Sequence, residues 1–239
     1  MSIQEIQCKS LLVKSNIPTL DYCINPYVGC LHACIYCYAR FMKRFTNHRE
    51  KWGRFLDIKV NGPEVLRKEL SRKPREGVVL LGSVTDPYQP PEAQYGITRR
   101  ILEALLPHRL EVSILTKSDL ILRDADLIAQ LQGHEVGLSV TTADDAVGKV
   151  FEPRASLPSR RIEALQRLHQ QGISTYAFIG PILPGLIRFE EVLDALQSHV
   201  DFVLAEALNT RCGSWSEVQA TLWEHYPCLG DEWERKVRS

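Results

Sequence analysis

Short apolar runs alternate with amphipathic segments along most of the chain. Five runs have the length and flanking residues of buried strands, at 78–84, 111–117, 135–142, 174–182 and 201–209, and we expect a sixth strand at about 20–26. The segments between them space their apolar residues as helices do, at 97–107, 123–131, 157–171 and 189–199. Because parallel strands need a crossover connection, this alternation predicts an α/β fold with a mostly parallel sheet.

Polar, Gly and Pro residues gather where these strands end. "NPYVGC" follows the first strand, "SVTDPYQ" ends the second and "TKSD" ends the third. Ligands of parallel α/β sheets bind at the edge where the carboxyl ends of the strands meet, so these segments predict a shared site there. The alternative is that turns into helices need such residues in any α/β protein. Six strands fit a partial barrel or an open doubly wound sheet.

Length and composition favour one domain with a substantial core. The chain has 239 residues, of which 44% are hydrophobic, and it shows no repeat, low-complexity tract or obvious linker. We therefore expect a single domain over 1–239, with a core at about 20–210. Residues 1–19 are then an N-terminal extension and 211–239 a C-terminal helical tail.

Charge and hydropathy limit the partners. Lysine plus arginine equals aspartate plus glutamate, 29 each, so a nucleic-acid or membrane surface would have to be a local patch. The N-terminus lacks a signal-peptide pattern, and no apolar run approaches the ~20 residues of a membrane span. We expect a cytoplasmic protein without a membrane partner, and the sequence predicts no particular oligomeric state.

Three of the seven cysteines lie within eight residues, in "CLHACIYC". Cys30, Cys34 and Cys37 place three thiols on one short loop, and clustered thiolates need a cation to offset their repulsion. Zinc is one candidate, with Cys23 or His32 as the fourth ligand, although structural zinc sites usually join two Cys-x-x-Cys units. The other candidate is an iron–sulfur cluster in which one iron has no cysteine and stays open to a ligand.

The spacing C-x-x-x-C-x-x-C after a first strand resembles the radical S-adenosylmethionine superfamily. Further segments resemble its subfamily related to spore photoproduct lyase, often labelled DNA-repair-photolyase-like. They are "NPYVGCLHACIYCYAR", "SVTDPYQPPEAQYGITRRILEAL", "ILTKSDLILRDADLI", "LSVTT" and "FEPRASLPSRRIEALQRLHQQGI". Together they cover about residues 20–210.

The resemblance implies a partial (β/α)6 TIM-like barrel and two cofactors. Cys30, Cys34 and Cys37 match the catalytic ligands of a [4Fe–4S] cluster, whose open iron binds S-adenosylmethionine. Reductive cleavage of that cofactor gives a 5′-deoxyadenosyl radical, which abstracts a hydrogen atom from the substrate. The barrel then orients and shields the radical.

Four residues near the first two strand ends match cofactor contacts. Tyr36 matches a position that packs near the adenine. Ser83, Thr85 and Asp86 lie where the family meets the methionyl amino group, and their hydroxyl and carboxylate oxygens suit an ammonium. The alternative for Asp86-Pro87 is that it only begins a turn.

Three later residues complete the expected cofactor site. Lys117 matches a lysine that reaches the cofactor's carboxylate; alternatively, its ammonium group only extends to solvent.

Ser139 matches a residue that contacts the ribose or the carboxylate; alternatively, it only packs within its strand. Arg154, two residues after Glu152, is expected either to contact the cofactor or to form an Arg–carboxylate clasp.

Residues 40–59 combine basic and aromatic side chains. Phe41, Phe45, Trp52 and Phe55 are interleaved with basic residues, while Glu50 and Asp57 are the only acidic ones. Phosphate neutralisation and stacking platforms are what a nucleic-acid surface needs. An amphipathic helix with a solvated basic face would give the same pattern.

The reaction and the partners follow from the resemblance with one departure. The lyase returns a hydrogen atom to its product from a cysteine, whereas this chain has no cysteine between Cys37 and Cys212. The residue that would donate the hydrogen atom is therefore not identified, and Tyr88 or Tyr95 is a candidate radical relay.

We expect hydrogen abstraction from an unidentified substrate, with a nucleic-acid base or lesion as one candidate. A reduced ferredoxin or flavodoxin would supply the electron. The alternatives are a zinc-stabilised nucleic-acid-binding module without catalysis and a cluster-bearing electron carrier.

Overall fold

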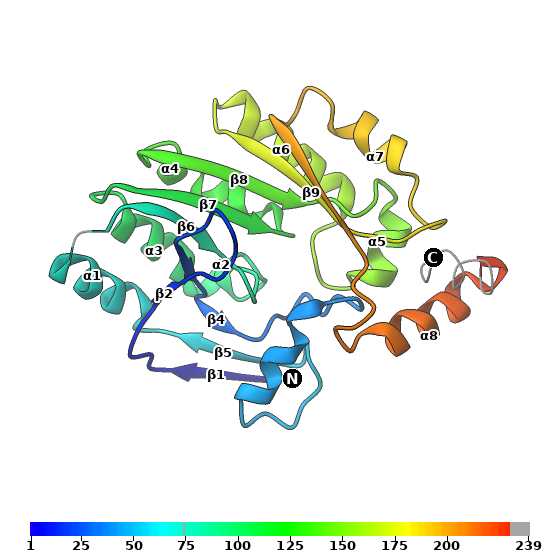
Figure 1. The fold of residues 1–239 in the computed structure, drawn as a ribbon, viewed down its shortest axis with the longest axis horizontal. Coiled ribbons are helices and arrows are strands. Elements are labelled where there is room, and N and C mark those ends of the chain that lie inside the picture. The colour runs from blue at the N-terminus through cyan, green and yellow to red at the C-terminus, as the bar shows by residue number, and fades with distance from the viewer. Residues whose placement is uncertain (74, 230–239) are drawn as a thin grey trace.

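The computed structural model describes residues 1–73 and 75–229, and its largest element is a curved seven-stranded sheet (Figure 1). The strand order is β10-β9-β8-β7-β6-β3-β2. The strands are β2 (Leu12–Lys14), β3 (Tyr22–Ile24), β6 (Gly77–Leu81), β7 (Leu110–Thr116), β8 (Gly133–Ser139), β9 (Thr175–Ile182) and β10 (Phe202–Ala207). Six of them run parallel, and only β2 is antiparallel, at the edge beside β3. This confirms the mostly parallel α/β fold of a partial barrel.

Helices connect the parallel strands as the hydrophobic spacing predicts. They are α1 (Gly62–Arg72), α2 (Glu92–Tyr95), α3 (Ile97–Leu105), α4 (Ala125–Ile128), α5 (Asp145–Phe151), α6 (Pro158–Gln170), α7 (Phe189–Leu196) and α8 (Trp215–His225). The helix expected at 123–131 is shorter. A 3₁₀ helix, η2 (Asp119–Asp124), takes its start, where the Ser118 hydroxyl accepts the N–H of Leu120.

A second, three-stranded sheet was not predicted. It has the order β1-β5-β4 and consists of β1 (Ser2–Ile6), β4 (Tyr27–Val28) and β5 (Phe55–Lys59). The basic and aromatic segment at 40–59 therefore does not form one amphipathic helix. It starts within the 3₁₀ helix η1 (Tyr38–Phe45) and ends in β5, where Phe55 is buried.

The main sheet separates an apolar face from a polar one. Alternate residues such as Val79, Val112 and Val136 are fully buried, and α6 packs on β8 and β9. The neighbouring positions point to the other face. There Tyr176 lies over Gly137, where an added Cβ would approach the phenol ring to 2.1 Å. The sheet thus buries its core beneath the helices and keeps its concave side for polar and aromatic residues.

Both ends of the chain contribute to the core, with Leu11 before β2 and Val218 and Leu222 of α8 buried in it. Of the C-terminal tail expected at 211–239, α8 and the 3₁₀ helix η3 (Pro227–Leu229) are described, and 230–239 lie outside the described residues. The described helices include none that is both long and apolar enough to cross a membrane.

Candidate functional site

The three clustered cysteines lie on the loop between β4 and η1, at the carboxyl edge of the main sheet. Gly29 opens this loop with a φ of +90°, a conformation that favours glycine. A Cβ at this position would come within 2.6 Å of the Phe55 carbonyl oxygen on β5. Only glycine therefore fits at this turn, where the loop lies directly against the second sheet.

Hydrogen bonds fix the loop to three other parts of the molecule. The buried Gln89 accepts the backbone N–H of Leu31 at 2.8 Å, and the Ile35 N–H donates to the Phe151 carbonyl at 2.8 Å. Arg40 donates to the Ile35 carbonyl at 2.6 Å. The thiols are thus placed by the loop after β6, by the end of α5 and by η1.

The three thiols lie close enough to affect one another's ionisation. Burial raises the pKa of Cys30 and of Cys34, and a negative charge on Cys37 raises both further. Lys117 acts in the opposite direction on Cys34 and Cys37. As they stand, residues 1–73 and 75–229 contain no group of three His, Cys, Asp or Glu side chains arranged to hold a metal ion. The case for a metal cofactor rests on the three converging thiols.

An unpaired indole supports this donor set. The Nε1–H of Trp52 is buried, and among the described residues no oxygen or nitrogen accepts it. It lies beside the Cys37 sulfur. Burial raises the pKa of Cys37, while the Ala39 N–H, Lys117 and the Trp52 N–H oppose that effect. A thiolate or a cluster sulfur at this place would give the buried N–H its acceptor, so these residues fit an iron–sulfur cluster.

Tyr36 and Glu152 belong to a buried polar network behind the thiols. The Glu152 carboxylate accepts hydrogen bonds from the Tyr36 hydroxyl, the Thr141 hydroxyl and the Arg161 guanidinium. Burial raises the pKa of Glu152, but Arg161 and Lys117 outweigh it, and the pKa lies below its usual range. Glu152 is therefore ionised and holds Tyr36 in place.

The Arg–carboxylate pair expected from "EPR" was assigned to the wrong arginine. Glu152 pairs with Arg161 of α6, whereas Arg154 donates to the Gly53 carbonyl at 2.8 Å. Arg154 thus joins the loop after α5 to the segment before β5, as a clasp of a different kind. Arg161 was not singled out because, in the sequence, it is one of two adjacent arginines in an amphipathic helix.

Lys117 lies over the Tyr36 ring beside the thiols. Its Nζ is 5.7 Å from the ring centroid and 4.0 Å from the nearer Glu152 oxygen. This cation is only loosely paired within its own chain, and part of its surface is accessible. It can therefore offset negative charge that develops at the thiols or on a bound carboxylate.

The carboxylate of Asp86 already accepts several hydrogen bonds from its own chain. Its carboxylate accepts from the Thr116 hydroxyl at 2.6 Å, from the Tyr88 N–H at 2.8 Å and from the Lys117 N–H at 2.8 Å. The His32 ring lies 3.4 Å away. Burial raises the pKa of Asp86, yet His32 and these donors hold it below its usual range. Asp86 thereby ties the ends of β6 and β7 to the cysteine loop.

The remaining expected residues lie on the same edge of the sheet. Ser83 accepts from the Asn25 side chain at 2.9 Å, and Thr85 donates to the Gly29 carbonyl. Ser139 is buried, and its carbonyl accepts from Arg161. The structure thus brings every expected residue except the Arg154 side chain to one edge around the thiols.

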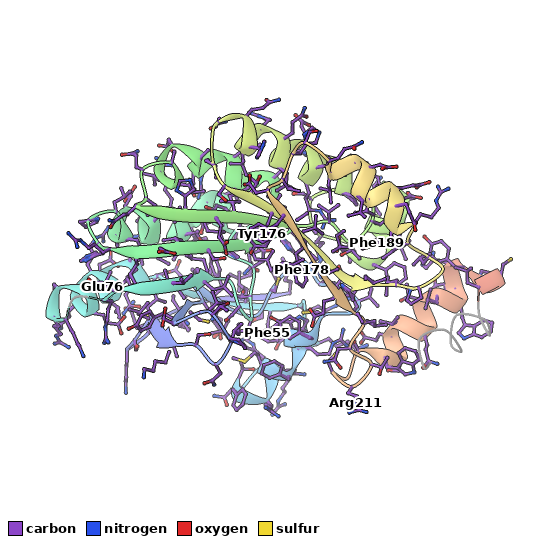
Figure 2. All side chains as sticks on the ribbon, turned by 45° about the horizontal axis from the view of Figure 1, so that its top comes forward. Phe55, Glu76, Tyr176, Phe178, Phe189 and Arg211 are labelled. Carbon is purple, nitrogen blue, oxygen red and sulfur yellow. The ribbon has the colours of Figure 1, made fainter. Side chains whose placement is uncertain are left out.

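Aromatic side chains also lie on the concave face, toward the amino ends of β9 and β10. Tyr176 and Phe178 alternate along β9 and therefore share a face, over the middle of the molecule in Figure 2. Tyr176 stacks on Phe202 of β10, with ring centroids 5.1 Å apart. Tyr176 and Phe202 lie at the starts of β9 and β10, away from the carboxyl edge that carries the thiols, and Tyr176 is buried.

Comparisons with solved structures agree with this arrangement. Spore photoproduct lyase complexed with dinucleoside spore photoproduct superposes with a TM-score of 0.67 at 17% identity, over 94% of this chain and 66% of the lyase. SuiB of Streptococcus suis, bound to the precursor peptide SuiA, gives a TM-score of 0.55 at 17% identity, over 79% of this chain and 39% of SuiB. At these identities the likeness concerns the fold.

Relatives in sequence identify the family to which the chain belongs. An uncharacterized protein of Methanocaldococcus jannaschii is 38% identical over 95% of this chain and 85% of its own length. A radical SAM Nα-GlyT isomerase of Pseudomonas phage M6 is 26% identical over 70% of this chain and 34% of its own length. The model of the Radical SAM superfamily matches residues 24–197. The chain belongs to the radical SAM superfamily and is a radical SAM enzyme.

Proposed function

We propose that Cys30, Cys34 and Cys37 hold a [4Fe–4S] cluster at which S-adenosylmethionine is reductively cleaved to start hydrogen abstraction from a substrate. The observation that carries this proposal is that three thiols, Cys34 buried and Cys30 and Cys37 half-buried, lie on one hydrogen-bonded loop at the carboxyl edge of a partial barrel. When bound, the two cofactors supply a 5′-deoxyadenosyl radical. The protein supplies binding, orientation and electrostatics.

The residues nearest the thiols hold charge at fixed places. Lys117 stabilises thiolate charge at Cys34 and Cys37 and would pair with the carboxylate of bound S-adenosylmethionine. Trp52 would donate its indole N–H to the Cys37 sulfur or to a cluster sulfide beside it. Because hydrogen bonds to sulfur stabilise added negative charge, Trp52 makes the centre easier to reduce.

A second group of residues positions the first. Asp86 and Thr85 fix the loop after β6 against the cysteine loop, and Glu152 orients Tyr36, whose ring packs near the adenine. Ser83 and Ser139 line the same edge as contacts of the methionyl amino group and the ribose. Arg154 acts as a structural clasp, because its side chain is bound to Gly53.

A nucleic-acid base is the favoured substrate class. One observation supports it: the dinucleoside photoproduct in the complex of spore photoproduct lyase, whose fold this chain shares. A reduced ferredoxin or flavodoxin would supply the electron.

The test is formation of 5′-deoxyadenosine by anaerobically purified protein with dithionite and S-adenosylmethionine. The native chain should carry iron and sulfide near four each per chain and form 5′-deoxyadenosine. The triple variant Cys30→Ala, Cys34→Ala, Cys37→Ala should lose both, whereas Cys228→Ala, at an exposed cysteine, should keep both. Zinc in place of iron would contradict the proposal and favour the zinc-stabilised module. A cluster without 5′-deoxyadenosine would favour the electron carrier.

A further inference from the structure

The 3₁₀ helix η1 carries a row of exposed aromatic and cationic side chains that the reaction at the thiols does not use. Side chains three residues apart eclipse one another on a 3₁₀ helix, so Tyr38, Phe41 and Arg44 follow one line. Tyr38 is 50%, Phe41 40% and the adjacent Phe45 66% exposed. Large exposed rings in succession indicate a binding surface.

A guanidinium holds the outer part of this row together. The Arg44 guanidinium carbon lies 5.4 Å from the Phe41 ring centroid and 4.7 Å from that of Phe45. Cation–π contacts at such distances restrict all three side chains before any ligand arrives. The result is two stacking surfaces with a positive charge fixed between them.

The inner end of the row lies at the candidate site. Tyr38 directly follows Cys37, and its hydroxyl donates to the Ser83 carbonyl at the end of β6. The row therefore starts beside the cysteine loop and the end of β6 and leads outward along η1.

The charge around the row is mostly positive. Residues 38–54 contain six basic residues and one acidic residue, Glu50. Arg40 is paired with Glu217 of α8 at 3.1 Å, and Lys43 donates to the Arg49 carbonyl at 3.1 Å. A ligand that crosses η1 would thus meet rings on a cationic background.

We propose that the row Tyr38–Phe41–Arg44, with Phe45, binds single-stranded nucleic acid and leads one nucleotide into the site. This rests on the proposed function, because the nucleotide is its substrate. Bases stack on exposed rings regardless of sequence, and phosphates pair with Arg and Lys. An acidic electron carrier would match the charge, but it has no need of exposed rings in a row that starts beside the cysteine loop.

The test measures binding of a fluorescein-labelled single-stranded DNA of about 12 nucleotides by anisotropy, with cluster-loaded protein. The double variant Phe41→Ala, Phe45→Ala should bind roughly tenfold or more weakly, since each lost stack removes about 1–3 kcal/mol. Arg44→Gln should weaken binding and reduce the salt slope by about one phosphate contact. Arg188→Gln, at a side chain that is 79% exposed on the far segment before α7, should change neither.

Two readouts separate this surface from the chemistry. Every variant should still form 5′-deoxyadenosine with dithionite. If the native chain itself forms none, the proposed function is overturned, whereas the DNA-binding result still decides on the surface. Unchanged DNA binding in both η1 variants overturns the surface proposal. So does a variant that binds DNA normally but is reduced more slowly by flavodoxin, because the surface then serves the electron carrier. The variants remove exposed side chains, and an unchanged melting temperature confirms that they fold.

Discussion

The indole N–H of Trp52 is buried beside the sulfur of Cys37. A buried N–H without a good acceptor costs about 1–3 kcal/mol, so we expect the indole to donate a hydrogen bond to sulfur at Cys37 in the working molecule. Its ring is fixed edge-on to Phe55, with centroids 5.7 Å apart. The donor therefore keeps its direction whether or not the cluster is bound.

Trp52→Phe should make the cluster harder to reduce. The change removes the donor and leaves the ring close in shape, so reduced sulfur loses one stabilising hydrogen bond. We expect a more negative midpoint potential in a redox titration followed by electron paramagnetic resonance. Trp223→Phe, the same change at an exposed site on α8, should leave the potential unaltered. Equal potentials for the two variants would show that the indole does not reach the centre.

At the scale of elements, α6 is joined to β8 and to the cysteine loop by one buried ion pair. Arg161 of α6 donates to the Ser139 carbonyl at the end of β8 and to Glu152, which in turn holds Tyr36. Burying such a pair adds little to the free energy of unfolding. Removing one partner lowers that free energy strongly, because the other charge stays unpaired in the interior.

Adjacent arginines on α6 allow a matched comparison. Arg161→Gln should lower the free energy of unfolding by about 3–5 kcal/mol, because Glu152 is left without its main partner. Arg160→Gln, at an exposed arginine that pairs with Asp119, should cost less than about 1 kcal/mol. Urea unfolding measures both.

The same network predicts a pH dependence. Folding lowers the pKa of Glu152. The contribution of Glu152 to the free energy of unfolding is therefore fully present above the unfolded pKa of about 4.3, and it is lost as pH falls through the lower folded pKa. The stability of Arg161→Gln should thus depend less on acid than that of the native chain. Equal costs for the two arginine variants at pH 7 would contradict the buried pair.

The turn into the cysteine loop should not tolerate a side chain. Gly29→Ala adds a Cβ where 2.6 Å separates it from a backbone oxygen, and it strains a residue with φ of +90°. We expect it to lose iron on purification. Gly185→Ala serves as control, because φ is +75° there but nothing lies within 4 Å of the added Cβ. Full iron content in Gly29→Ala would mean that the contact with β5 does not determine the conformation of the cysteine loop.

Across the whole molecule, the repeated pattern was predictable and the exceptional contacts were not. Five apolar runs and the three cysteines are local signals, and they predicted the parallel sheet and placed the thiols at its carboxyl edge. The sheet of β1, β4 and β5 joins short segments that are far apart in sequence, so no local period reveals it. Arg161, Trp52 and Gln89 act through partners more than eight residues away or through burial, which composition does not encode.

The sheet does not close on itself. Its two outermost strands, β10 and β2, are not paired with each other, and β10 exposes Phe202 and Leu204. A closed barrel would admit a long molecule only end first, through its mouth. A curved sheet with one free side lets a polymer be laid in from the flank and released the same way. Chemistry at an internal position of a long chain then needs no free end and no threading.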